Sequence, residues 1–116
     1  MAKDSLFKGM INLDYLSSDS GKELLSRLSK FNYEKGTNLY LHNFKLEDLG
    51  VEFISFCNFK QLQVLYLDQT QITDRAIEHL IKCDFKQLQR LNLDQTQITD
   101  ISKLKTKYPN CFIRYY

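Results

Sequence analysis

Leucines at alternate positions mark two short segments of the chain that are nearly identical. The stretch FKQLQVLYLDQTQITD, residues 59–74, returns 26 residues later as FKQLQRLNLDQTQITD, residues 85–100, with two positions changed. A period of two is typical of a strand that buries one face, since successive side chains point to opposite sides. The pattern predicts two strands whose leucines enter a core and whose other side chains point to solvent.

Apolar residues at helical spacing lie between the predicted strands. The tetrapeptide SGKE at residues 20–23 has the form of a capping box, and the apolar residues after it predict a helix over residues 21–30. A second helix is predicted after Asp74. A third is predicted after Asp48, where Gly50 weakens the helical pattern.

The 26-residue period extends over most of the sequence. A fixed period of this size is typical of a solenoid, in which each unit stacks on its neighbours and cannot bury its apolar face alone. One domain of 116 residues is therefore expected. It consists of a degenerate capping unit (7–32), three repeats (33–58, 59–84 and 85–110) and a C-terminal cap strand (111–116).

The N-terminal segment has two interpretations. Apolar residues between positions 4 and 16 fit a capping helix, whereas the 26-residue alignment favours a first strand over residues 11–16. That strand would place Asp14 or Leu16 at the edge of the exposed face.

The order L-x-x-L-x-L-x-x-T-x-I, which starts at Leu62 and again at Leu88, resembles the leucine-rich repeat family. The 26-residue length of the repeat and the Ile-Thr-Asp after each strand are similar to the cysteine-containing subclass of this family and to short bacterial repeat proteins. Thr70 and Thr96 stand where that subclass usually has Cys or Asn. The segment LKTKYPNCFI, residues 104–113, resembles the closing segment of those bacterial proteins. The resemblance implies an α/β leucine-rich repeat solenoid, a short horseshoe with parallel strands on the concave face and helices on the convex face.

Composition and charge narrow the range of partners. With 16 basic and 14 acidic residues the net charge is +2, which argues against a dedicated binder of nucleic acid or of an acidic membrane. No apolar run reaches transmembrane length, and the N-terminus does not resemble a signal peptide. Cys57, Cys83 and Cys111 show no C-x-x-C spacing, so reduced thiols in the cytoplasm are expected, with no metal and no cofactor.

Few residues offer catalytic chemistry. His42 and Asp68 occupy equivalent positions one period apart, so they are expected about 5 Å apart on neighbouring strands, where His42 could act as a general base. A hydrolase would also need a nucleophile, and Cys111 is expected two or more strands away. His79 is expected on a solvated helix face. We therefore expect no enzymatic activity.

The exposed face of the predicted sheet supplies the candidate contact residues. Tyr and Arg anchor many protein interfaces, because each combines large contact area with directional polar groups. Both differences between the near-identical stretches, Val64 against Arg90 and Tyr66 against Asn92, fall on this face. The full set is Asn38, Tyr40, His42, Val64, Tyr66, Asp68, Gln69, Arg90, Asn92, Asp94, Gln95, Arg114 and Tyr116.

These features favour a non-enzymatic protein-binding module, monomeric when free, that masks or inhibits a partner protein such as an enzyme. The resemblance to short bacterial repeat proteins, some of which pathogens deliver into host cells, implies an effector or a regulator of an effector. The alternative is an adaptor that bridges a target to another complex such as a ubiquitin ligase. Masking needs one binding face, whereas an adaptor needs two.

Overall fold

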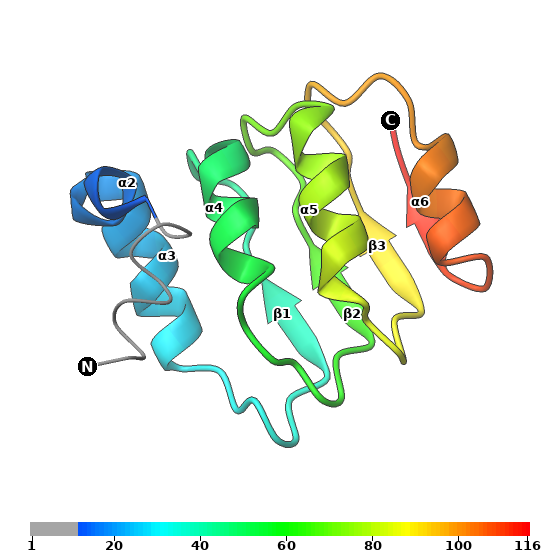
Figure 1. Cartoon of the computed structure of the whole chain (residues 1–116), viewed down its shortest axis with the longest axis horizontal. Helices are drawn as coiled ribbons and strands as arrows, with labels where there is room; N and C mark the ends of the chain where they lie inside the picture. The colour runs from blue at the N-terminus through cyan, green and yellow to red at the C-terminus, as the bar shows by residue number, and fades with distance from the viewer. Residues whose placement is uncertain (1–11) are drawn as a thin grey trace.

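Two layers, a parallel sheet and a row of helices, make up the computed structural model, which describes residues 12–116 (Figure 1). The four strands lie in chain order: β1 (Asn38–Tyr40), β2 (Val64–Tyr66), β3 (Arg90–Asn92) and β4 (Phe112–Arg114). The helices are α2 (Leu13–Ser17), α3 (Asp19–Ser29), α4 (Glu47–Ile54), α5 (Arg75–Cys83) and α6 (Ser102–Lys107). The chain is a mixed α/β protein, and the prediction of parallel strands that alternate with helices is confirmed.

Residues 26 apart in the sequence pair directly in the first three strands. Leu39 pairs with Leu65, and Leu65 pairs with Leu91, so the expected row of leucines is present. The last connection is shorter, since Ile113 pairs with Leu91 after 22 residues (113 minus 91). The helices of Figure 1 cover one face of this sheet, and α3 stands beside β1.

The core lies between the sheet and the helices. Each strand contributes the side chains that face the helices, and each of α3, α4 and α5 contributes an apolar stripe at helical spacing. Burying one such aliphatic side chain stabilises a fold by about 1.5–3 kcal/mol. The fully buried members include Leu24, Leu41, Leu46, Ile54, Leu62, Leu65, Leu67, Ile72, Leu80, Leu91, Leu93 and Leu104.

The predicted strand over residues 11–16 is wrong where the structure describes it, since Leu13–Ser17 is helix α2. The side chain of Asn12 caps this helix by accepting a hydrogen bond from the backbone N–H of Tyr15 (2.8 Å). Asp14 and Leu16 therefore do not extend the sheet. The rest of that segment, and of the capping helix considered over residues 4–16, lies outside the described residues.

The helix predicted over residues 21–30 begins two residues earlier. Its N-cap is Ser18, whose hydroxyl accepts a hydrogen bond from the backbone N–H of Gly21 (3.1 Å), and not Ser20. The other two predicted helices are confirmed as α4 and α5. Within residues 12–116, no helix is long and apolar enough to cross a membrane.

The loops after β1, β2 and β3 share one backbone feature. Asn43, Gln69 and Gln95 have positive φ angles of 61°, 55° and 58°, in the left-handed region. In the loops after β2 and β3, a threonine follows that bonds the strand end: Thr70 donates to the Leu67 carbonyl (2.8 Å), and Thr96 donates to the Leu93 carbonyl (2.9 Å). Each hydroxyl therefore satisfies the carbonyl of the leucine three residues before it.

Candidate functional site

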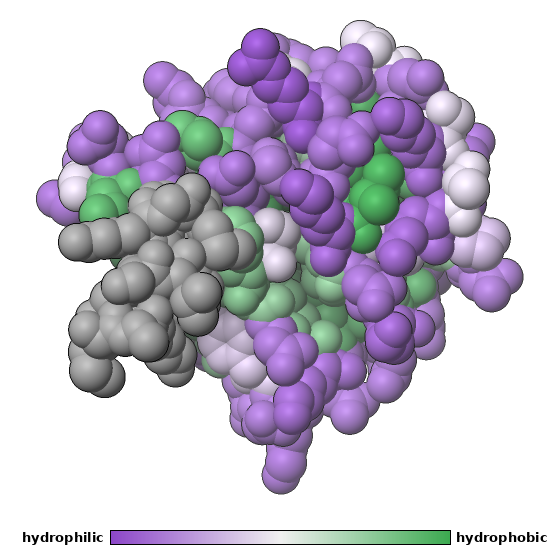
Figure 2. Space-filling model, viewed as in Figure 1, coloured by the Kyte–Doolittle hydropathy of each residue, from purple (hydrophilic) through white to green (hydrophobic). Residues whose placement is uncertain are grey.

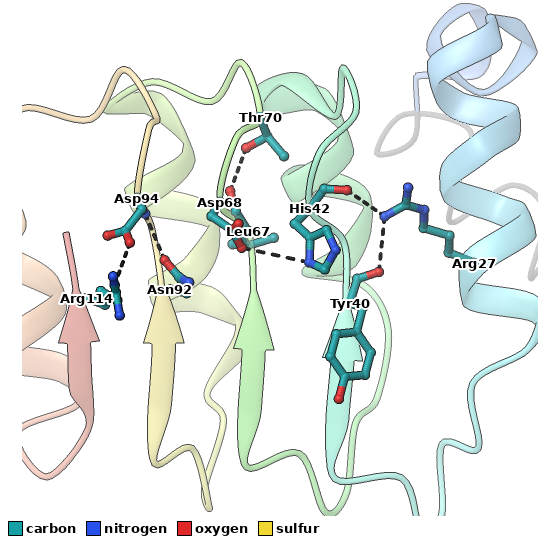
Figure 3. A network of polar contacts seen from close by, with 9 residues as sticks. All are labelled: Arg27, Tyr40, His42, Leu67, Asp68, Thr70, Asn92, Asp94 and Arg114. Atoms are coloured by element: carbon teal, nitrogen blue, oxygen red, sulfur yellow. Dashed lines mark hydrogen bonds and ion pairs between the residues drawn. The ribbon is translucent and has the colours of Figure 1, made fainter. Parts of the chain in front are cut away.

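The sheet face opposite the helices carries two outward side chains from each strand. The strand register places them in neighbouring pairs, and they are exposed or half-buried. Figure 3 views the sheet from this side, with the helices behind it. The outward residues, termed the open face, are Asn38, Tyr40, Val64, Tyr66, Arg90, Asn92, Phe112 and Arg114.

Two tyrosines form the aromatic part of the open face. The rings of Tyr40 and Tyr66 stack with centroids 4.9 Å apart and planes at 8°. The imidazole of His42 meets both rings edge-on, with centroids 6.1 Å and 6.0 Å away. Aromatic pairs of this kind add about 0.5–1.5 kcal/mol beyond their area burial, so the cluster is held in place before any partner arrives.

His42 and Asp68 lie together, as the sequence predicts, but do not form a hydrogen bond. Their closest atoms, Nδ1 and Oδ1, are 3.9 Å apart, which is too long for such a bond. Both atoms are buried, and neither has a hydrogen-bond partner among the residues that the structure describes. The two side chains therefore leave a donor or acceptor of their own unsatisfied.

The structure does not bring Cys111 to this pair. Cys111 precedes β4, whereas His42 follows β1, so β2 and β3 separate them and they lie at opposite ends of their strands. Burial also raises the pKa of the Cys111 thiol to about 11, which disfavours the thiolate that a nucleophile needs. Burial raises the pKa of Cys57 as well, and that of Cys83 to about 12. All three thiols are free.

His79 lies on the helix side of the molecule, but it is less solvated than expected. Its side chain is 21% exposed, and its Nε2 lies 3.9 Å from a carboxylate oxygen of Glu52 on α4. Among the residues that the structure describes, no group of three or more His, Cys, Asp or Glu side chains could hold a metal ion.

The β4 side of the open face has its own polar network. Arg114 Nε lies 2.5 Å from Asp94 Oδ2, and the guanidinium lies 5.3 Å from the ring centroid of Tyr116. The other carboxylate oxygen of Asp94 accepts a hydrogen bond from the Tyr116 backbone N–H (2.9 Å). Asp94 also donates its own N–H to the Asn92 side chain (3.0 Å). These contacts fix Arg114 beside the exposed ring of Tyr116.

Gln69 and Gln95 extend the candidate site beyond the strands. Both side chains are exposed, and each directly follows an aspartate that lies two residues beyond the end of its strand. The two loops are linked, since the Gln69 N–H donates to the carbonyl of Asp94, the residue before Gln95 (2.9 Å). The thirteen predicted contact residues thus come from the strands β1 to β4 and the segments that follow them at their C-terminal ends.

Sequence reasoning left Arg27 out of the predicted set and offered Phe112 only as an alternative to Tyr116 at the C-terminal edge of the face. Phe112 is 61% exposed and pairs with Arg90, so it belongs to the open face. Arg27 on α3 donates to the carbonyl of His42 (2.7 Å) and to that of Tyr40 (3.4 Å), as Figure 3 shows. An ion pair with Glu23 (2.8 Å) orients Arg27, and its i, i+4 spacing was the one visible signal. Arg27 thus satisfies carbonyls on the side of β1 that points away from β2, where the described part of the chain places no further strand.

A hollow opens on the face between β2 and β4. It has a volume of about 160 Å³, and its lining includes Val64, Tyr66, Arg90, Phe112 and Arg114. The helix side of the molecule looks different, because hydrophilic side chains dominate it and apolar ones appear mainly in depressions (Figure 2).

Protein-family models, curated proteins and solved structures give no match to this chain.

Proposed function

We propose that the chain is a leucine-rich repeat module that binds another protein through the open face. The observation that carries this proposal is the grouping of Tyr40, Tyr66, Phe112 and two arginines on a sheet face that none of the helices described in residues 12–116 covers. Tyr and Arg are enriched among the residues that dominate binding energy at interfaces. The open face is therefore the surface we assign to the partner.

The repeat architecture is part of this proposal. Strand pairing between residues 26 apart and the inward row of Leu39, Leu65 and Leu91 support a solenoid in which the open face is the concave side. The repeated loop residues with positive φ, Asn43, Gln69 and Gln95, support the same interpretation.

The area of the sheet requires contacts beyond the strands. Four strands about 4.8 Å apart and about 10 Å long present only about 200 Å² in projection. A stable interface takes about 800 Å² from each partner. We therefore expect the partner also to contact the loops at Gln69 and Gln95 and the exposed ring of Tyr116.

Masking of the partner is the mode of action we propose. The open face is ordered by ring stacking and by the Asp94–Arg114 ion pair, so little conformational entropy is lost when a partner binds. A preformed surface of this kind suits a cover over an active site or a docking site. An effector or a regulator of an effector would work in this way.

A capture experiment tests the proposal. Wild-type protein, the triple variant Tyr40→Ala/Tyr66→Ala/Arg90→Ala and a helix-side control, Arg75→Ala/Lys82→Ala/Lys105→Ala, are used as bait in the native lysate. Wild type and control should retain the same partner, and the triple variant should bind it at least about 100-fold more weakly, because hot-spot residues contribute about 2 kcal/mol or more each. Retention by the triple variant would refute the assignment of the open face.

Activity of the captured partner separates masking from bridging. A masked partner loses activity in proportion to bound wild-type protein. A partner that stays active while the helix-side control loses a second protein would instead identify an adaptor.

A further inference from the structure

The hollow on the open face has the size of one side chain. Its volume of about 160 Å³ is close to the roughly 150 Å³ cavity that accommodates benzene. Sites for drug-sized molecules run to about 300–1,000 Å³. A single residue of a partner fits this hollow better than a metabolite does.

The lining of the hollow combines apolar and aromatic side chains with two arginines. Val64 and Tyr66 line it from β2, and Phe112 lines it from β4. Arg90 on β3 and Arg114 on β4 supply the positive charge. No carboxylate stands among the eight residues of the open face.

In the described part of the chain, Arg90 lacks the ion pair that the other arginine of the hollow has. Arg114 is paired with Asp94, and on the helix side Lys103 pairs with Glu78 (2.8 Å) and Lys107 with Asp84 (3.0 Å). Within residues 12–116, Arg90 has no carboxylate at salt-bridge distance, and its side chain is exposed. A guanidinium binds a carboxylate through two parallel hydrogen bonds, which a lysine cannot do.

The two near-identical stretches differ only at positions that line this hollow. Residues 59–74 and 85–100 are identical except at Val64 against Arg90 and at Tyr66 against Asn92. All four of these residues line the hollow. The differences between the two stretches therefore place apolar and aromatic side chains on β2 and a cationic side chain on β3, beside one another in the same hollow.

We propose that this hollow binds an acidic side chain, Glu or Asp, of the partner protein, with the carboxylate on Arg90 and the methylene groups between Val64, Tyr66 and Phe112. This rests on the proposed function and specifies the chemistry of its partner. The neighbouring Tyr40–Tyr66 stack supplies an apolar surface for the residues next to that acid.

Peptide selection tests the proposal without knowledge of the partner. A phage-displayed library of random heptapeptides is selected on wild type, on Arg90→Glu and on the charge-matched control Arg75→Glu, an exposed position on α5. Wild type and Arg75→Glu should enrich peptides that contain Asp or Glu next to apolar residues. Arg90→Glu should enrich Lys or Arg at the same place.

Affinity measurements follow with a fluorescein-labelled peptide selected on wild type. Arg90→Gln should raise Kd by about tenfold or more, and replacing the peptide's acidic residue with its amide should do the same. The two changes together should cost little more than either alone, because both remove one contact.

Other outcomes overturn the inference. If the selected peptides lack an acidic residue but lose binding to Tyr40→Ala/Tyr66→Ala, the hollow does not bind an acidic side chain. The proposed function would still stand. Peptides insensitive to every open-face substitution, or no enrichment, would count against both. Single-stranded oligothymidylate that binds through Arg90 more tightly than the peptide would show that a phosphate, and not a carboxylate, is the anion.

Discussion

The carboxylate of Asp48 accepts two hydrogen bonds from Thr73, one from the backbone N–H (2.7 Å) and one from the hydroxyl (2.6 Å). Asp74 holds Thr99 in the same way one repeat later. Each aspartate lies at the start of a helix, and each threonine lies in the loop that leads to the next one. These pairs tie consecutive repeats together on the helix side of the sheet.

Replacing Asp48 with alanine should lower the free energy of unfolding by about 2 kcal/mol, because hydrogen bonds to a charged group contribute about 1.5–3 kcal/mol. Urea unfolding of the purified protein measures this change. In a double-mutant cycle, Asp48→Ala and Thr73→Val should together cost less than the sum of their separate effects. Strict additivity would show that the pair does not interact in solution.

The second pair predicts a pH dependence. The hydrogen bond from the Thr99 hydroxyl, followed by the one from its N–H, lowers the pKa of Asp74 below its ordinary value of 3.8. Because the folded-state pKa lies below the unfolded one, the stabilisation is fully present above the unfolded pKa and is lost as the pH falls through the folded value. The urea midpoint of Asp74→Asn should therefore fall less than that of wild type when the pH drops below 3.8.

The carboxylates of Glu78 and Asp84, whose pKa values are also lowered, remain unchanged in both proteins. Hydrogen bonds lower the pKa of Asp100 as well, and the Asp74 charge opposes this by raising it, so the difference between the two pH profiles reports the loss of Asp74 together with its effect on Asp100. Parallel profiles would contradict the role assigned to Thr99.

Gly50 is required by a close approach of two helices. A Cβ at this position would lie 2.3 Å from Leu46 Cδ1 and 2.6 Å from the Tyr15 hydroxyl, which donates to the Leu46 carbonyl (2.6 Å). Glycine to alanine in a helix usually stabilises by about 0.5–1 kcal/mol. Here Gly50→Ala should destabilise the fold by about 1–3 kcal/mol, because the neighbours are buried and fixed.

Thermal unfolding of Gly50→Ala, alone and with Tyr15→Phe, measures this effect. Removing the hydroxyl should relieve part of the clash, so the cost of Gly50→Ala should be smaller in the Tyr15→Phe background. A stabilised Gly50→Ala variant would mean that α2 does not pack on α4 as described.

Gln69 adopts a backbone conformation that suits glycine. Its φ of 55° lies in the left-handed region, which costs an ordinary L-residue about 1–2 kcal/mol. Glycine avoids this cost but loses more conformational entropy on folding than glutamine does, which offsets only part of the gain. Gln69→Gly should therefore raise the free energy of unfolding by about 0.5 kcal/mol. Gln71, two residues further on, does not have a positive φ, so Gln71→Gly should lower the free energy of unfolding. Urea unfolding of both variants measures the two changes.

The strand register could be predicted because the same strand pattern occurs twice in the sequence, 26 residues apart. Leu65 and Leu91 occur in copies that differ at two positions, so the same local structure and the same pairing follow for both. The N-terminal segment could not be assigned in this way. Leu13 and Tyr15 have the spacing of a strand, yet Leu13 is 61% exposed, and the cap of Asn12 together with the hydroxyl of Tyr15 decides for a helix.

The outward side chains of β1, β2 and β3 could likewise be predicted from alternation alone. The hollow could not, because Phe112 enters it from a strand that follows a shorter connection and has no copy elsewhere in the chain. Arg27 escaped prediction for a similar reason. Its contact with the carbonyl of His42 depends on where α3 stands beside β1, which no local pattern specifies.

That contact also determines where this sheet can grow. Arg27 occupies the carbonyls of Tyr40 and His42, so no additional strand can join β1 there without displacing it. Since residues 26 apart already pair in register, a tandem duplication of residues 59–84 would insert a strand in the interior and leave both borders of the sheet unchanged. Each added copy should therefore widen the sheet by one strand between the same two borders.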